Sequence, residues 1–232
     1  MSLFPGPQES CFYLDPQKGL TDDDKWFDSS PFGLHVTPVG FSPPTWGIST
    51  GPSGAKMITF NGTTQRGTID TRIYSSLAAA TSTMTIAVVA KYTSYSGPDG
   101  AVFDTRPNTL NRGIVVYVPA TQDLRLNGGD SAGVTWEIAS LGNVFPRTRV
   151  DIFTSDLSGW SYATYTDRSC ITRAITTARN PVSYDVTKVP EIGRFGNLNR
   201  FLGFDLYLLA IWPFAFTHAE STAFSDYWLD RL

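Results

Sequence analysis

Two groups of side chains in this 232-residue sequence have the types that sugar binding requires. An aromatic ring can stack on the apolar face of a sugar, while amide, carboxylate and guanidinium groups bind its hydroxyls. The rings are Trp160, Tyr162 and Tyr165, and the polar groups are Asp104, Arg106, Asn108 and Asn111. These seven residues form our predicted ligand-binding site. The alternation of the rings also fits a structural role, because most aromatic residues on strands face the core.

The residue pattern gives no comparable set for catalysis or for an organic cofactor. The two histidines, His35 and His218, are far apart, and no Gly-x-Ser-x-Gly segment accompanies them. Gly193-x-x-Gly196 lacks the Lys-Ser/Thr pair that follows in a phosphate-binding loop. We therefore predict no catalytic residues and no cofactor.

Four aspartates provide the only pattern that suits a metal ion. Asp22, Asp23, Asp24 and Asp28 carry the hard oxygen ligands that calcium prefers. Aspartates clustered in a loop are more often simply solvated, so we assign no metal site. Calcium near this segment stays an open alternative.

Composition and charge restrict the partners. The net charge of −3 and the scattered arginines argue against nucleic acid. No apolar run reaches the roughly 20 residues that span a bilayer. The N-terminal residues resemble no secretory signal, so we expect synthesis and folding in a cytoplasm. In that compartment the two cysteines, Cys11 and Cys170, are expected to be free buried thiols, although a single disulfide between them stays open.

The segments that must position the predicted ligand-binding residues have the sequence pattern of β-strands. Short β-branched and aromatic runs recur roughly every eight to twelve residues between turn signals, which is typical of a two-sheet antiparallel jelly-roll sandwich. Residues 149–154 and 160–166 form a predicted hairpin around Asp156-Leu157-Ser158-Gly159, and Asn127-Gly128-Gly129-Asp130 is a predicted glycine turn. The other predicted strands span residues 11–15, 34–38, 45–48, 56–60, 67–70, 83–92, 101–105, 113–118, 123–126, 134–140 and 170–175.

The longest apolar run lies within residues 190–216 and predicts the central strand of the sandwich, because few polar residues interrupt it. Thr217-His218-Ala219-Glu220 then fits a capping box that begins a short C-terminal helix. We expect a loose Pro-rich arm over residues 1–10 and one domain over residues 11–232, since sandwiches of this size are commonly single domains.

The order of these features resembles the concanavalin A-like lectin and glucanase superfamily, and within it the laminin-G-like domains. The resemblance covers roughly residues 11–232, and it implies the sandwich fold. The matching segments are Asp28-Ser29, Phe60-Asn61-Gly62, residues 85–90, residues 113–118, Tyr165-Thr166-Asp167, Ile192-Gly193, Phe201-Leu202-Gly203 and residues 217–220. Glucanases of this superfamily share a Glu-x-Asp-x-x-Glu strand, and none of the four glutamates here lies in such a pattern.

These observations lead to a hypothesis of function. Domains of this fold usually work outside cells, yet we expect no export signal, and both hold for bacteriophage proteins released by lysis. Our leading hypothesis is therefore a non-enzymatic virion structural protein of the capsid or tail, which contacts other virion proteins and presents loops to host surface glycans. Its oligomeric state stays open, with a homo-oligomer as one alternative. A free or cell-surface lectin is the alternative, and a glycoside hydrolase with an atypical site is the third.

Overall fold

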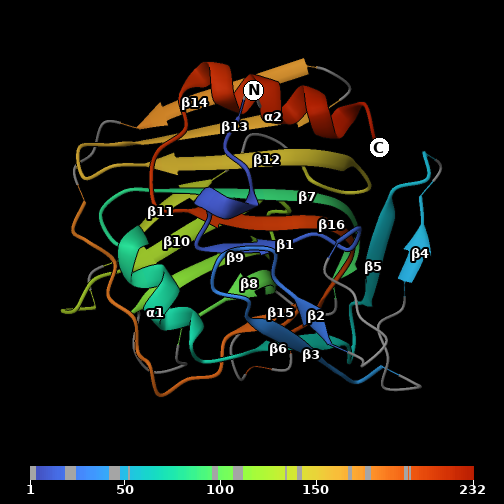
Figure 1. Cartoon of the computed structure of the whole chain (residues 1–232), viewed down its shortest axis with the longest axis horizontal. Coiled ribbons are helices and arrows are strands. Elements are labelled where there is room, and N and C mark those ends of the chain that lie inside the picture. Colours follow the sequence, from blue (N-terminus) through green and yellow to red (C-terminus); the bar gives the residue numbers. More distant parts are fainter. Residues whose placement is uncertain are drawn as a thin grey trace.

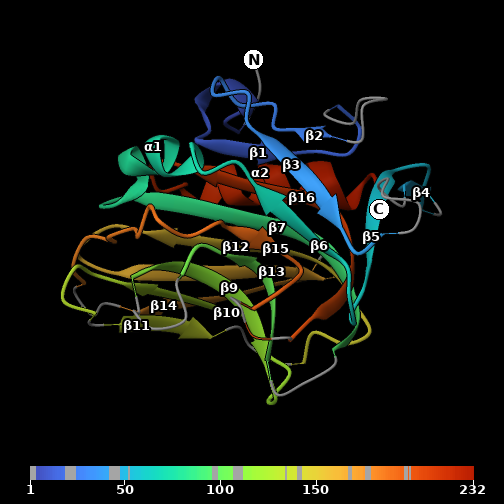
Figure 2. The same cartoon turned by 90° about the horizontal axis from the view of Figure 1, so that it is seen from below.

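The described residues of the chain form two antiparallel sheets of eight strands each, packed face to face, with a helix across the outer side of one of them (Figures 1 and 2). The computed structural model describes residues 4–18, 25–41, 48–51, 53–95, 99–106, 112–133, 135–139, 143–166, 169–175, 179–195, 198 and 200–232. Side chains of residues 95, 160, 162, 164–166, 169, 170 and 173–175 lie outside the description. The predicted two-sheet sandwich with a C-terminal helix is confirmed.

The first sheet, called sheet A, is built around the long strand that the sequence predicts. Across it run β14 (Ser169–Ile175), β13 (Trp160–Thr166), β12 (Thr148–Ser155), β7 (Met84–Tyr95), β16 (Leu202–Trp212), β5 (Lys56–Asn61) and β4 (Ile48–Thr50), and β1 (Phe12–Leu14) also pairs with β16. Every residue of β16 is buried, which explains its unbroken apolar sequence. Its one acidic residue, Asp205, accepts a hydrogen bond from Thr59 at 2.7 Å.

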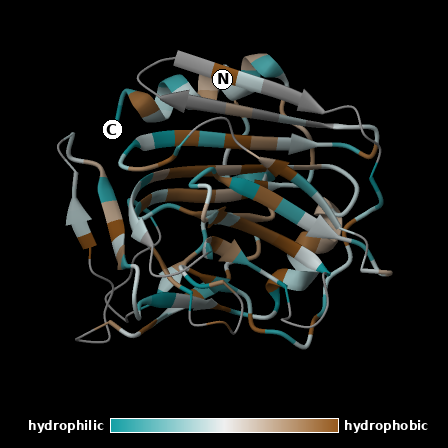
Figure 3. Cartoon of the chain, turned by 180° about the vertical axis from the view of Figure 1, so that it is seen from behind, coloured by the Kyte–Doolittle hydropathy of each residue, from teal (hydrophilic) through white to brown (hydrophobic). Residues whose placement is uncertain are grey.

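The second sheet, called sheet B, carries the shorter strands. In order these are β11 (Thr135–Ala139), β10 (Arg125–Gly129), β9 (Gly113–Pro119), β8 (Asp99–Asp104), β15 (Glu191–Ile192), β6 (Arg66–Ile69), β3 (His35–Val39) and β2 (Trp26–Phe27). One apolar cluster fills the space between the two sheets, and hydrophobic residues follow the strands at the centre of the molecule (Figure 3). Cys11 belongs to this cluster as a free buried thiol, as predicted.

Helix α2 (His218–Leu229) adds a third layer on the outer face of sheet A (Figure 1). Its predicted capping box is present, because Thr217 accepts from the Glu220 amide and Glu220 accepts from the Thr217 amide. A second apolar cluster lies beneath the helix and includes Trp212 and Phe224. The sandwich therefore has two hydrophobic cores, one on each side of sheet A.

The described part of the expected loose arm is packed against this helix. Residues 7–9 form a 3-10 turn, η1 (Pro7–Glu9), and the Trp212 indole N–H donates to the Gly6 carbonyl at 3.2 Å. The Phe4 ring meets the Phe224 ring at 5.3 Å between centroids. Residues 4–10 are thus held by aromatic burial rather than hanging free, which corrects our expectation for that part of the arm.

One further local prediction is wrong, and one short helix was not predicted. Asn127-Gly128-Gly129 continues strand β10 instead of turning, and the turn comes at residues 130–133. Gly128 is needed there for space, because a Cβ atom on it would lie 1.9 Å from the Trp136 ring on β11. The sequence reading also missed a short helix, α1 (Ile73–Leu77), which continues into the 3-10 turn η2 (Ala78–Ala80).

Arg179 links the two sheets near the end of β12 and the start of β7. Its guanidinium donates to the Ser155 hydroxyl on β12 and to the carbonyls of Thr81 and Ser82, at 2.7 to 2.9 Å. The same group lies over the Trp136 ring of sheet B at 5.3 Å. Burial lowers the pKa of Arg179 to about 10, so it stays charged at neutral pH.

Candidate functional site

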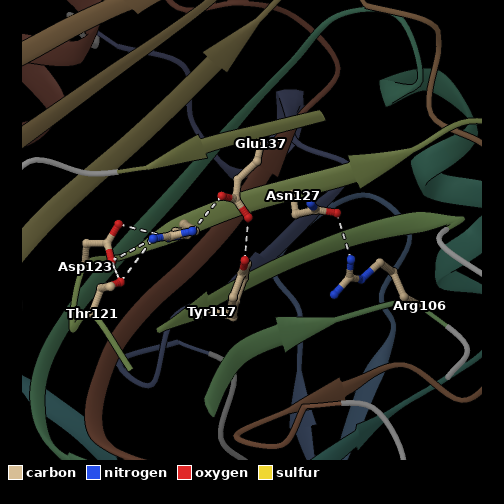
Figure 4. Close-up of polar contacts among 7 residues, drawn as sticks. Arg106, Tyr117, Thr121, Asp123, Asn127 and Glu137 are labelled. Atoms are coloured by element: carbon tan, nitrogen blue, oxygen red, sulfur yellow. Dashed lines mark hydrogen bonds and ion pairs between the residues drawn. The ribbon is translucent and has the colours of Figure 1, made fainter. Parts of the chain in front are cut away.

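The candidate site is the outward side of β9, β10 and β11 in sheet B. Directly opposed residues on antiparallel strands share one face of the sheet. Val116 and Leu126 are opposed and fully buried, so the neighbouring positions, Tyr117 and Arg125, lie on the outward side. We call this side the open face and define it by Arg106, Tyr117, Arg125, Asn127 and Glu137, whose contacts Figure 4 shows.

An ion-pair network holds one end of the open face. Arg125 donates to Glu137 at 2.8 Å and to Asp123 at 2.9 Å, and a further bond reaches the Thr121 hydroxyl at 3.0 Å. The Tyr117 hydroxyl points at Glu137 and donates to its second carboxylate oxygen (Figure 4). One guanidinium thus fixes two carboxylates and, through Glu137, a phenol in a set geometry.

A cation and two rings form the other end. The Arg106 guanidinium donates to the Asn127 side-chain oxygen at 2.7 Å (Figure 4) and lies 5.4 Å from the centre of the Phe195 ring. Phe195 in turn meets Tyr117 edge to face, with 5.5 Å between ring centroids. Tyr117 and Phe195 are both half-buried, so each ring keeps an accessible part beside polar groups.

The electrostatics of the open face keep its groups in fixed protonation states. Burial, together with the bond to Glu137, raises the pKa of Tyr117, so the phenol stays a hydrogen-bond donor at neutral pH. Although burial alone raises the pKa of Asp123, bonds from Thr121 and Arg125 outweigh it and hold that pKa below its ordinary value. Burial lowers the pKa of Arg106, an effect that the nearby Asp104 opposes.

Two charged residues extend this face toward the middle of sheet B. The register pairs Asp104 of β8 with Glu191 of β15, and both side chains are buried. Asp104 accepts the Arg106 amide at 2.8 Å, and Glu191 accepts two bonds from Arg194 at 2.5 and 2.6 Å. Burial raises the pKa of Glu191, and its arginine partners oppose the rise.

The structure describes the backbone of five of the seven predicted site residues, and these five lie on two different sheets. Asp104 and Arg106 lie at the end of β8 in sheet B, and Arg106 belongs to the open face. Trp160, Tyr162 and Tyr165 lie on β13 of sheet A, where the register pairs Tyr162 with Phe153 and Tyr165 with Val150. Asn108 and Asn111, like the side chains of the three aromatic residues, lie outside the described residues. The role of these seven residues in ligand binding stays a prediction.

The structure describes only one of the four aspartates considered as calcium ligands. Asp22, Asp23 and Asp24 lie outside the described residues, whereas Asp28 is buried and accepts the amides of Ser30 and Leu34. Burial raises the pKa of Asp28 against these bonds. Within the part of the chain that the structure describes, no three His, Cys, Asp or Glu side chains gather as metal ligands would.

Sequence reading missed Tyr117, Asn127 and Glu137 as site residues. The sequence predicts a glycine turn at Asn127, places Tyr117 on a strand without a role, and gives Glu137 no place in a glucanase pattern. Alternation along residues 113–118 could have put Tyr117 on the outward side, but only the strand register shows that Glu137 lies beside Asn127.

Comparisons with known proteins give fold relatives without sequence relatives. No family model matches the chain, and no curated protein matches it. No described helix is long and apolar enough to cross a membrane.

The receptor-binding domain of a botulinum neurotoxin C/D mosaic serotype superimposes with a TM-score of 0.67 at 10% identity, over 94% of this chain and 51% of that one. The binding domain of botulinum neurotoxin DC in complex with SialylT gives 0.62 at 11% identity, over 97% and 52% of the two chains. The receptor-binding domain of botulinum neurotoxin type G gives 0.66 at 9% identity, over 95% and 52%.

This chain therefore spans about half the length of those neurotoxin chains. At such low identity the likeness shows the shared sandwich fold and assigns no residue a role. It supports a β-sandwich of the kind found in receptor-binding domains, and it leaves the finer resemblance to laminin-G-like domains as a prediction.

Proposed function

We propose that this chain is a non-enzymatic, lectin-like module that binds a glycan across the open face. The observation that carries the proposal is the array itself. Tyr117 and Phe195 offer ring surface, while Arg106, Asn127 and Glu137 surround it with donors and acceptors held by hydrogen bonds. A sheet face of this composition suits an oligosaccharide, because rings stack on sugars and fixed polar groups select their hydroxyls.

The fold relatives support the same class of function. They are receptor-binding domains, one of them in complex with SialylT, and another is described as dependent upon interaction with two ganglioside molecules for cell entry. Those ligands belong to domains of which this chain matches about half. The proposal for this chain therefore rests on its own open face, with the relatives as support.

A glycan array with purified protein tests the proposal. We expect saturable binding to a subset of oligosaccharides, weakened about tenfold or more by Tyr117→Ala and by Asn127→Ala, which corresponds to 1.4 kcal/mol or more. Thr37→Ala is the matched control, because Thr37 is exposed on the same side of sheet B, on β3. Equal binding by all four proteins, or uniformly flat arrays, would contradict the proposal.

The same samples separate binding from hydrolysis. Asp104 and Glu191 are the carboxylates that a hydrolase would use on this side of sheet B, since they are adjacent across two strands. We expect array oligosaccharides to remain intact after long incubation, because Glu191 is tied up by two arginines. Release of reducing ends that Asp104→Asn abolishes would replace our proposal with the glycoside hydrolase.

We further propose that this protein is a structural component of a virus particle. It comes from the sequence reading, and the fold relatives neither supply nor oppose it. Mass spectrometry of purified particles tests it, and a set of virions lacking this chain would end it. Glycan binding at the open face would stand in either case.

A further inference from the structure

A cavity of about 380 Å³ lies at the C-terminal end of α2, on the sheet A side of the molecule. Three groups of residues that are distant in sequence line it: residues 15–18 after β1, residues 53–55 before β5, and residues 227–231 at the end of α2. The lining residues used below are Asp15, Lys18, Ser53, Tyr227, Asp230 and Arg231. Its volume falls within the range of small-molecule sites, about 300 to 1,000 Å³.

Asp15 gives the cavity a carboxylate acceptor. Only 4% of this residue is exposed, and its Oδ1 accepts the Gln17 amide at 2.8 Å. Oδ2 is not one of the buried, unpartnered atoms among the described residues, and Asp15 lines the cavity, so this oxygen can accept a hydrogen bond from a ligand there.

The mixed charges around the cavity favour a ligand of no net charge over a simple anion or cation. Lys18 and Arg231 are near enough to Asp15 to act on its ionisation, and both line the cavity. Asp230 adds a second carboxylate. An anion would meet two carboxylates and a cation would meet two basic groups, whereas a hydroxyl can donate to Asp15 and accept from Lys18 or Arg231.

The aromatic wall is already in place. The Tyr227 ring lies 5.2 Å from Phe4 and 5.8 Å from Trp228, and the Arg231 guanidinium stacks 3.4 Å from its centre. The Arg231 carbonyl accepts the Ser53 hydroxyl, which ties the end of the chain to the β4–β5 turn. A cavity fixed in this way loses little entropy when a ligand enters.

We propose that this cavity binds a neutral, polyhydroxylated ligand of monosaccharide to disaccharide size through Asp15, Lys18 and Arg231. It is a second site, built on sheet A and α2, whereas the open face is built on sheet B. It takes a small sugar end-on in a pocket, while the open face takes an oligosaccharide. The two sites use no residue in common, so each can be tested without the other.

Calorimetric titration with free sugars tests the cavity. The probes are glucose, galactose, N-acetylgalactosamine and maltose, with glucuronic acid and glucosamine as an anionic and a cationic comparison. We expect saturable millimolar binding of at least one neutral probe and weaker binding of both charged probes. Asp15→Asn should weaken that binding about tenfold or more, because one bond to a charged group is lost. Lys18→Met should weaken it by a smaller factor.

Asp15→Asn is suited to this test because it keeps size and an oxygen for the Gln17 amide. Burial already raises the pKa of Asp15, so removing its charge does not threaten the fold. Tyr117→Ala on the open face is the matched control and should leave the neutral probe bound. No binding of any neutral probe, equal binding by Asp15→Asn, or stronger binding of a charged probe would overturn the cavity site. Loss of binding only in Tyr117→Ala would overturn it as well and assign the sugar to the open face.

Discussion

The two sheets of this sandwich differ in what lies on their outer sides. The outer side of sheet A is apolar, and Trp212, Leu208 and Ala210 are buried there beneath α2. The outer side of sheet B near β9 to β11 carries charged and polar groups that keep partial exposure, such as Arg125 at 26% and Glu137 at 32%. One face is held by the hydrophobic effect and the other by a hydrogen-bonded network.

Because of this difference, the residues that stabilise the fold and the residues that we propose bind a ligand lie on different faces. Apolar area removed from water contributes roughly 25 cal/mol per Å², so the contact between α2 and sheet A stabilises the fold. Exposed ion pairs contribute little, about 0 to 1 kcal/mol each. The residues of the open face are therefore free to be selected for binding, whereas those under α2 are constrained by packing.

The largest expected effect comes from opening the covered side. Phe224 is fully buried, and its ring contacts Phe4, Trp212 and Phe216. Phe224→Ala should lower the free energy of unfolding by about 3 to 5 kcal/mol, as buried Phe→Ala changes do. Urea denaturation measures it. Tyr117→Ala on the open face should cost about 1 kcal/mol or less. Equal losses for the two variants would mean that the two sides are not energetically distinct.

A second prediction compares two ion pairs. Arg149 and Asp151 on β12 form a 2.8 Å pair, with side chains 3% and 0% exposed, on the side of the strand that faces sheet B. Asp151→Ala removes one partner of a buried guanidinium and should cost about 3 to 5 kcal/mol. Thermal unfolding at two salt concentrations measures it.

The matched change is Glu137→Ala, which removes a partner of Arg125 on the open face. It should cost about 1 kcal/mol or less, because Arg125 keeps Asp123 and water. Added salt should weaken this pair and leave the buried pair almost unaffected. A loss for Glu137→Ala as large as that for Asp151→Ala would show that the open-face network is itself structural.

A third prediction tests the inner side of the open face. Gly128 faces Trp136 across β10 and β11, so a methyl group at residue 128 would force the indole to move. Gly128→Ala should cost about 1 to 3 kcal/mol by overpacking. It should also loosen Arg179, which stacks on that ring. Near-ultraviolet circular dichroism and urea denaturation measure both effects.

Gly133→Ala is the control for glycine loss, because no atom lies within 4 Å of its added Cβ atom, although its positive φ adds some strain. A wild-type spectrum and stability for Gly128→Ala would show that the indole has room to spare.

Much of this fold follows from local sequence. The uninterrupted apolar residues of β16 and the Thr217 capping box predicted a central strand and a closing helix, because both patterns depend on neighbours in the chain. Asn127-Gly128-Gly129 was misread because the same glycine signal serves a turn or a close approach between strands. What decides between them is Trp136 on the next strand, and the register sets that contact.

The candidate sites were harder to predict for the same reason. The open face joins Arg106, Tyr117 and Glu137 through strand register, and the cavity joins Asp15 to Arg231 across the whole chain. In neither site do the contributing residues occur at a fixed spacing in the sequence. Arg106 belongs to the predicted site because it lies in a predicted loop between strands, where binding residues are common.

The smallest expected effect concerns the pH dependence of Asp15. Burial raises its pKa in the folded protein, and Lys18 and Arg231 oppose the rise. Between the unfolded and folded pKa values the folded state binds more protons, so stability falls as pH rises through that window. Ionised Asp15 therefore destabilises the empty protein at neutral pH.

The Asp15→Asn variant should be slightly more stable than wild type at pH 7, by less than Gly128→Ala loses, and the difference should vanish below pH 4. Thermal melts of both proteins from pH 3.5 to 7.5 measure it. A variant less stable than wild type at pH 7 would mean that the Asp15 carboxylate is stabilised by its basic neighbours.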